Sequence, residues 1–125
     1  MKRNWQVIRI ILEHIEAEDL PEYIRGNAYL QDVENADELL GHIEILIEAG
    51  ILHHCEVLRN KQGEFAFWDF RGAYMTMQGH DLLETLRSKT LWNKIRAKAA
   101  ACGMSLSWEF VKQAIPLAIK ETLNG

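Results

Sequence analysis

Histidine and cysteine are the residue types in this sequence that most often mark a zinc site. His53 and Cys55 are two positions apart, so on a β-strand their side chains would share one face, where His80 or Cys102 could join them. Zinc sites are usually marked by closely spaced ligand pairs such as Cys-x-x-Cys, and the sequence contains none. We therefore expect polar strand residues and a core thiol here, and no metal site.

Catalytic motifs are also missing from the sequence. It has no glycine-rich phosphate loop, no Gly-x-Ser-x-Gly turn and no paired-aspartate motif. His80 follows Gly79 and would need a nucleophile or a carboxylate beside it to act in catalysis, and the spacing reveals neither. We expect a protein that is not an enzyme, needs no cofactor and acts by binding macromolecules.

Basic side chains are the residues that could contact DNA phosphates. Residues 51–125 hold ten Lys/Arg against seven Asp/Glu, whereas residues 1–50 hold four against eleven. A solvated surface is the alternative interpretation of these basic residues. The candidates for DNA contact lie in a turn-rich segment and in a later predicted helix: Arg59, Lys61 and Arg71, then Lys94, Arg96 and Lys98.

Acidic residues gather on a helix predicted at residues 36–49. Asn35 is its expected N-cap, Glu38 completes a capping box, and Gly50 is its expected C-terminal stop. Apolar residues share one face of this helix, and an acidic surface around an isoleucine on the other face would suit a basic protein partner. The candidates for protein contact on that outward face are Asp37, Glu38, Gly41, Glu44, Ile45 and Glu48.

Periodicity and turn residues predict the other elements. An amphipathic helix is expected at residues 4–18, and a connection with a short strand at residues 19–34. Residues 51–58 and 65–70 should form a β-hairpin closed by the turn-forming residues 60–63. Further helices are expected to begin near Thr76, Leu91 and Ser107.

The last predicted helix has apolar residues on two sides. Phe110 and Leu117 lie opposite its main apolar face, which indicates a helix that is covered on both sides. The cover could come from within the fold or from a homodimer formed through this C-terminal helix, and we favour the homodimer. Pro116 lies inside the helix and should kink it.

The order of elements predicts an α+β fold that is mostly α. We expect a winged helix-turn-helix core with a β-hairpin wing at residues 1–76. A C-terminal helical extension at residues 77–125 should pack on this core, giving a single compact domain of a size that 125 residues support. With two cysteines, no signal peptide and no long apolar run, we expect a cytoplasmic protein without membrane contact.

Four segments spread over most of the chain resemble a known family. They are Met1–Arg9, Leu46–Ile51 with the preceding His42, Met75–Leu83 and Thr90–Ile95. The family comprises small bacterial and bacteriophage proteins, classed as a domain of unknown function with a winged-helix core. The resemblance implies a winged-helix fold and a phage or mobile-element setting, and it implies no activity.

Two functions follow as hypotheses. Winged helices commonly bind DNA, so a DNA-binding transcriptional regulator is the first. The helix at residues 36–49 would be repelled by phosphates, so DNA contacts are expected from the hairpin or the basic extension. The alternative is a protein-binding module that uses this acidic face, such as an antitoxin-like or anti-defence inhibitor that mimics DNA.

Overall fold

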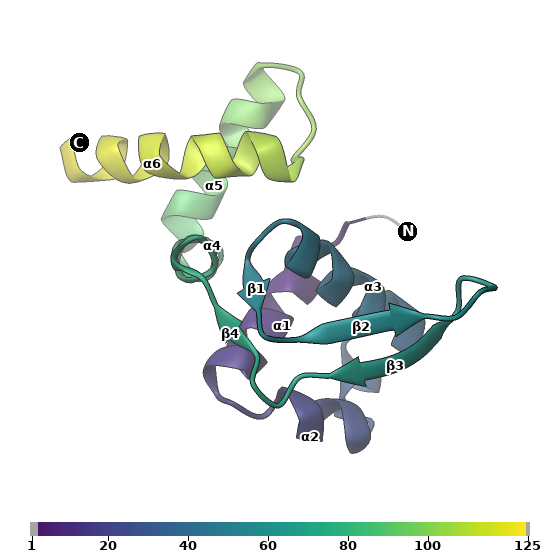
Figure 1. Ribbon diagram of the computed structural model, residues 1–125. Helices are drawn as coiled ribbons and strands as arrows, with labels where there is room; N and C mark the ends of the chain where they lie inside the picture. The colour runs from purple at the N-terminus through teal and green to yellow at the C-terminus, as the bar shows by residue number, and fades with distance from the viewer. Residues whose placement is uncertain (1–2, 125) are drawn as a thin grey trace. The chain divides into compact units, whose positions relative to one another are not determined.

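The computed structural model describes residues 3–124 and shows an α+β chain that is mostly helical (Figure 1). The chain divides into two compact units, an N-terminal unit, Met1–Gly79, and a C-terminal unit, His80–Gly125. Helix α4, Met77–Arg87, crosses the boundary between them. The expectation that the extension packs on the core as one compact domain stays a prediction.

The first helix of the N-terminal unit, α1, spans Trp5–Glu16, and this prediction is confirmed. The side-chain oxygen of Asn4 caps it by accepting the backbone N–H groups of Gln6 and Val7. Its buried residues recur at helical spacing, as an amphipathic helix requires: Val7, Ile8, Ile11, Leu12 and Ile15.

The segment after α1 is helical, so the predicted short strand in residues 19–34 is wrong. Helix α2 spans Leu20–Arg25, and a 3-10 helix, η1, spans Ala28–Gln31. Pro21 lies in the first turn of α2, where a missing N–H costs no helical hydrogen bond. Asn27, with φ of 60°, turns the chain between the two helices.

Helix α3 spans Ala36–Glu48, with the predicted caps at both ends. Asn35 Oδ1 accepts the Glu38 N–H at 2.9 Å, while the Glu38 carboxylate accepts the backbone N–H of Glu34 rather than that of Asn35. At the other end Gly50 has φ of +74°, and Ile51 N–H donates to the Leu46 carbonyl at 2.9 Å. This is a Schellman motif, which directs the chain out of the helix into the strands.

The buried surface of α3 is wider than its apolar stripe. Gly41 is buried, so its predicted place on the outward face is wrong, and His42 is also buried. The reason is that α3 is covered by several elements, since it contacts α1, η1 and the first two strands. Ile45 and Glu44 are half-buried, whereas Asp37 and Glu48 are exposed.

Four strands complete the N-terminal unit and form two antiparallel pairs (Figure 1). Strand β1, Leu52–His53, pairs with β4, Tyr74–Met75; strand β2, Glu56–Arg59, pairs with β3, Phe65–Asp69. The predicted hairpin is therefore present, but the single strand predicted at 51–58 is wrong. His54 has φ of 57°, a left-handed conformation that bends the backbone and separates β1 from β2.

The C-terminal unit contains two long helices that pack on each other, α5, Lys89–Ala101, and α6, Trp108–Asn124. Ser88 caps α5 and Ser107 caps α6, each through its hydroxyl oxygen. The three predicted C-terminal helices are confirmed. The buried residues of α5 and α6 are small or branched: Ile95, Ala99, Val111, Ala114, Ile115 and Ala118.

Candidate macromolecule-binding surfaces

The hairpin and α3 are joined by an ion pair that unites the two sets of candidate residues. Arg59 donates from Nε and Nη2 to the two carboxylate oxygens of Glu44, at 3.0 and 2.9 Å. Its Nη1 also donates to the Gly63 carbonyl in the hairpin turn, and its guanidinium lies 3.9 Å from the Phe65 ring centre. The pKa of Arg59 is raised, chiefly by the Glu44 hydrogen bonds and further by Asp37 and Glu48. Arg59 is therefore neutralised by the acidic face of α3.

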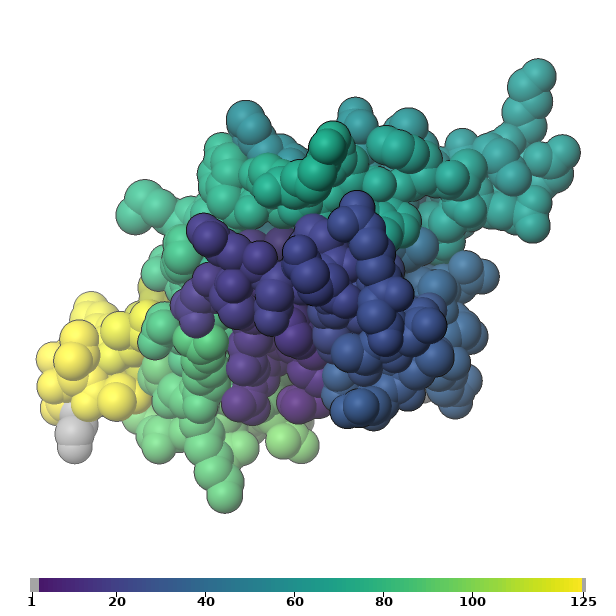
Figure 2. All heavy atoms as spheres, turned by 90° about the horizontal axis from the view of Figure 1, so that it is seen from below, coloured from purple at the N-terminus to yellow at the C-terminus, as the bar shows by residue number. Residues whose placement is uncertain are grey.

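A second arginine of the hairpin segment is also paired. Arg71 donates to Asp69 from Nη2 at 2.8 Å and from Nε at 3.0 Å, and its backbone N–H adds a third bond. These bonds lower the pKa of Asp69 to about 2. Lys61 differs, since it is exposed in the hairpin turn with no ion-pair partner among residues 3–124. Figure 2 shows this turn projecting from the N-terminal unit.

One face of the hairpin carries apolar side chains that sequence reasoning missed. Leu58 and Phe67 are register partners, and 51% and 50% of their surfaces are exposed. They alternate with Val57 and Trp68, and Trp68 lies on the opposite face under the Arg25 guanidinium. The signal was present, since β2 contains two consecutive apolar residues and β3 contains four, and consecutive residues of a strand point to opposite faces.

Two of the basic candidates of the extension hold α5 to α6. Lys98 Nζ lies 2.6 Å from Glu121 Oε1, and Lys94 Nζ donates to Thr122 Oγ1 at 2.9 Å. The hydrogen bond from Lys98 lowers the pKa of Glu121. These two lysines therefore serve the packing of the unit.

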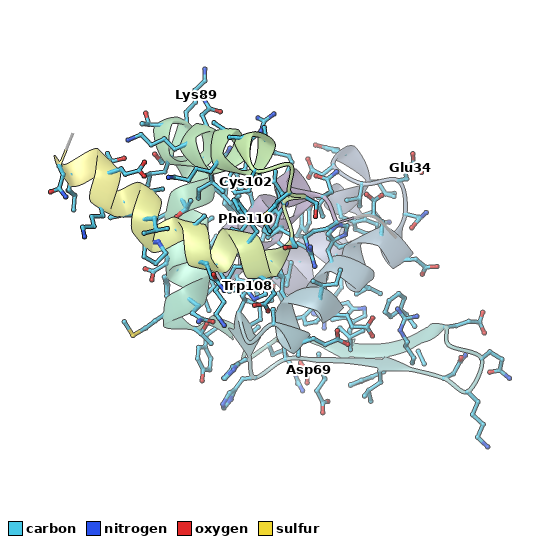
Figure 3. All side chains as sticks on the ribbon, turned by 90° about the horizontal axis from the view of Figure 1, so that it is seen from above. Glu34, Asp69, Lys89, Cys102, Trp108 and Phe110 are labelled. Atoms are coloured by element: carbon cyan, nitrogen blue, oxygen red, sulfur yellow. The ribbon has the colours of Figure 1, made fainter. Side chains whose placement is uncertain are left out.

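The opposite side of α5 presents a basic and polar stripe. Arg96 is exposed and has no ion-pair partner in the described chain, and the same holds for Lys89, seven residues earlier. Asn93 lies between them at helical spacing, and Figure 3 shows Lys89 pointing away from α6. Lys89 was missed by sequence reasoning, although its spacing from Arg96 was a usable signal. We call the set Lys89, Asn93 and Arg96 the α5 stripe.

The histidines and cysteines do not gather. Within residues 3–124 no three His, Cys, Asp or Glu side chains lie close enough together to hold a metal ion. The rings of His53 and His54 both lie against Tyr74, with centres 6.0 and 5.1 Å from it. Burial raises the pKa of the Cys55 thiol to about 11, which disfavours the reactive thiolate.

Most of the chain matches a known protein family. Residues 2–105 match the family described as "Hypothetical protein (DUF2513)", which spans α1 to α5. The chain belongs to this family. A relative from Haemophilus influenzae, described as an uncharacterized protein, is 27% identical over 130 aligned residues that cover 98% of this chain and 99% of the relative. No solved structure matches the chain.

None of the described helices is both long enough and apolar enough to cross a bilayer.

Proposed function

We propose that this chain is a non-catalytic DNA-binding regulator whose main contact with the duplex is the α5 stripe. We further propose that the N-terminal unit is a winged helix-turn-helix and that the protein serves a phage or mobile element. The element order supports the winged helix-turn-helix, since α1, α2 and α3 are followed, after the short strand β1, by the β2–β3 hairpin. The step from such a fold to DNA is an analogy, so the surface chemistry has to carry the argument.

The charge of α5 is the observation that carries this proposal. Its 13 residues, KTLWNKIRAKAAA, include four Lys/Arg and no Asp or Glu. Lys94 and Lys98 are occupied by α6, which leaves Lys89 and Arg96 for a ligand. Because phosphate contacts dominate DNA affinity, a helix face with unpaired cations and no carboxylate favours a duplex. Asn93 between them is a residue type that reads adenine edges in the major groove.

Helix α3, the usual recognition element of a winged helix, is poorly suited to the duplex. Its outward side carries Asp37, Glu44 and Glu48, and its nearest cation, Arg59, is held by Glu44. A duplex approaching this side would meet carboxylates and would have to compete for Arg59. The hairpin therefore contributes Lys61 at its tip, and the larger contribution comes from α5.

The test is a DNA-binding titration with matched charge reversals. Fluorescence anisotropy with a labelled duplex at 50 and 200 mM salt should show salt-sensitive binding by the natural chain. Arg96→Glu should weaken binding at least about tenfold and reduce the salt slope by about 1. Lys112→Glu is the control, because Lys112 is an exposed cation of α6 that lies outside the α5 stripe. The proposal fails if the natural chain shows no salt-sensitive binding, or if both variants lose affinity equally.

A second candidate function is favoured by the exposed part of the acidic face. Asp37 and Glu48 are exposed and have no ion-pair partner in the described chain, which suits a basic protein segment. An inhibitor that mimics DNA would use such a face. Asp37→Lys with Glu48→Lys should abolish binding to an arginine-rich peptide, whereas Asp81→Lys with Glu84→Lys on α4 should leave it unchanged. Equal binding by the first variant and the natural chain would reject this candidate.

A further inference from the structure

We propose that a second copy of this chain docks in an apolar groove of the C-terminal unit, with the two α6 helices antiparallel about a two-fold axis near Gln113. This interface goes beyond the proposed DNA contact and does not depend on it. It also gives a defined geometry to the homodimer that the two-sided apolar pattern of α6 suggests.

The groove lies between the end of α5 and the first half of α6 and has a volume of about 480 Å³. Its apolar wall is formed by Cys102, Met104, Phe110, Ala114 and Leu117. Figure 3 shows Cys102 and Phe110 on the same side of the two helices. Met104 and Leu117 are 53% and 55% exposed, and together with the other residues of the wall they form one apolar surface rather than single exposed residues.

The α6 side of the groove has the spacing of a helix–helix seam. Phe110, Gln113 and Leu117 are three and four residues apart, so they form one narrow stripe along the helix. In an antiparallel pair centred near Gln113, Phe110 of each copy lies beside Leu117 of the other. The two Gln113 side chains meet near the axis, where amides can donate and accept hydrogen bonds with each other.

The charges beside this seam select a second copy as the occupant. Glu109 and Lys120 are eleven residues apart and therefore lie on the same flank of the helix, about 20° apart. Both are exposed, and neither has an ion-pair partner in the described chain. An antiparallel arrangement brings the same flanks together, so Glu109 of each copy lies within about 3 Å, along the helix axis, of the level of Lys120 in the other. Symmetry then gives two ion pairs, and the face is complementary to itself.

The exposed apolar face of the hairpin does not have self-complementary charges. Leu58 and Phe67 of the hairpin are flanked by Glu56 and Asp69, and Asp69 is already paired with Arg71, so within the described residues this flank carries an unpaired carboxylate and no unpaired cation to match it in a second copy. Self-complementary charge therefore distinguishes the α6 groove from the hairpin face.

The first experiment is sedimentation velocity of the full chain between 1 and 100 µM. We expect a dimer whose dissociation constant rises about tenfold with Glu109→Lys or with Lys120→Glu, because each reversal opposes like charges. The combined variant Glu109→Lys, Lys120→Glu should regain most of the affinity. A monomer at 100 µM overturns the proposal, as does a combined variant that is no better than the single reversals.

A cross-linking experiment tests the register independently of charge. In a Cys102→Ser background, Gln113→Cys should form an intermolecular disulfide rapidly under mild oxidation, because the axis brings the two positions together. Lys112→Cys, one residue earlier but turned away from the seam, is the matched control. Equal rates for the two cysteines overturn the antiparallel arrangement, and far-UV circular dichroism verifies that both variants are folded.

Discussion

At the scale of single residues, His42 is explained by two hydrogen bonds. Its Nε2 accepts the backbone N–H of Asn4 at 2.9 Å, and its Nδ1 donates to the Glu38 carbonyl at 2.7 Å. A carbonyl can only accept, so the hydrogen lies on Nδ1 and the ring is neutral. His42 is completely buried and joins α3 to the start of α1, which is a structural role.

Replacing His42 by alanine should therefore destabilise the protein. We expect a loss of roughly 2–4 kcal/mol in the free energy of unfolding, from the cavity and from the Asn4 N–H, which loses its partner. Urea denaturation followed by circular dichroism measures this loss. His80→Ala is the control, because His80 is exposed on α4, and it should change the value by less than about 0.5 kcal/mol. Equal stability of the two variants would contradict the role assigned to His42.

The Asp69 carboxylate gives a prediction about pH. Arg71 lowers its pKa to about 2 from the ordinary value of 3.8, so Arg71→Gln should return the pKa toward 3.8. Since the folded-state pKa is the lower one, the ionised Asp69 favours folding above pH 3.8, and this contribution disappears as the pH falls toward 2. A carboxyl-detected NMR titration follows both forms. The Glu121 titration serves as internal reference, because its pKa is lowered by Lys98 and should not respond to Arg71→Gln.

At the scale of elements, local signals decided which parts were predictable. The bounds of α1 and α3 could be predicted because their caps, Asn4, Asn35 and Gly50, act within a few residues of the helix ends. Helix α2 was missed because it has six residues and no side-chain cap, so its pattern is too short to show a period. The break between β1 and β2 depends on the left-handed His54, for which the sequence carries no signal.

The surfaces were less predictable, because they depend on contacts between distant residues. Arg59 and Glu44 belonged to different candidate sets, and no spacing rule joins residues fifteen positions apart. Lys98 and Glu121, separated by 23 positions, are a similar case. The sequence therefore identified the basic and acidic residues, while the fold determined which of them are already paired.

The close approach of β1 to α4 gives a prediction for Gly79. A methyl group there would lie 2.8 Å from the Ile51 carbonyl oxygen, closer than real Cβ contacts, and 3.0 Å from the Met75 Cβ, which is tighter than most of them. Gly79→Ala should cost about 1–3 kcal/mol of stability by forcing the first turn of α4 away from the strand. Thermal and urea unfolding measure this cost. Gly72→Ala, whose nearest neighbour is the His54 carbonyl at 3.6 Å, should be nearly neutral.

At the scale of the whole molecule, charge divides along the two units. Residues 1–79 contain 7 Lys/Arg and 14 Asp/Glu, giving −7, while residues 80–125 contain 7 and 4, giving +3. If DNA is bound through the C-terminal unit, the N-terminal unit opposes that binding by long-range repulsion. The affinity of the whole chain for nucleic acid would then depend on the attraction by the C-terminal unit less the repulsion by the N-terminal unit.

Reducing the negative charge of the N-terminal unit should strengthen DNA binding. Asp37→Asn with Glu48→Asn removes two negative charges without adding a cation, so we expect affinity to rise about two- to tenfold at 50 mM salt. At 300 mM salt the difference should nearly vanish, because the Debye length is then shorter than 10 Å. Anisotropy titrations at the two salt concentrations measure both values. A decrease in affinity would show that these carboxylates take part in recognition.

The bonds of Arg59 have a consequence for the entropy of association. One guanidinium connects α3, the carbonyl of Gly63 and the Phe65 ring, so both strands and the turn of the hairpin are held before any partner arrives. A hairpin without this support would lose backbone and side-chain freedom on binding, at a cost of about 1–2 kcal/mol per residue that becomes ordered. Here much of that ordering already exists in the folded chain. The hairpin is thus preorganised, and a ligand that displaces Arg59 from Glu44 would restore its freedom.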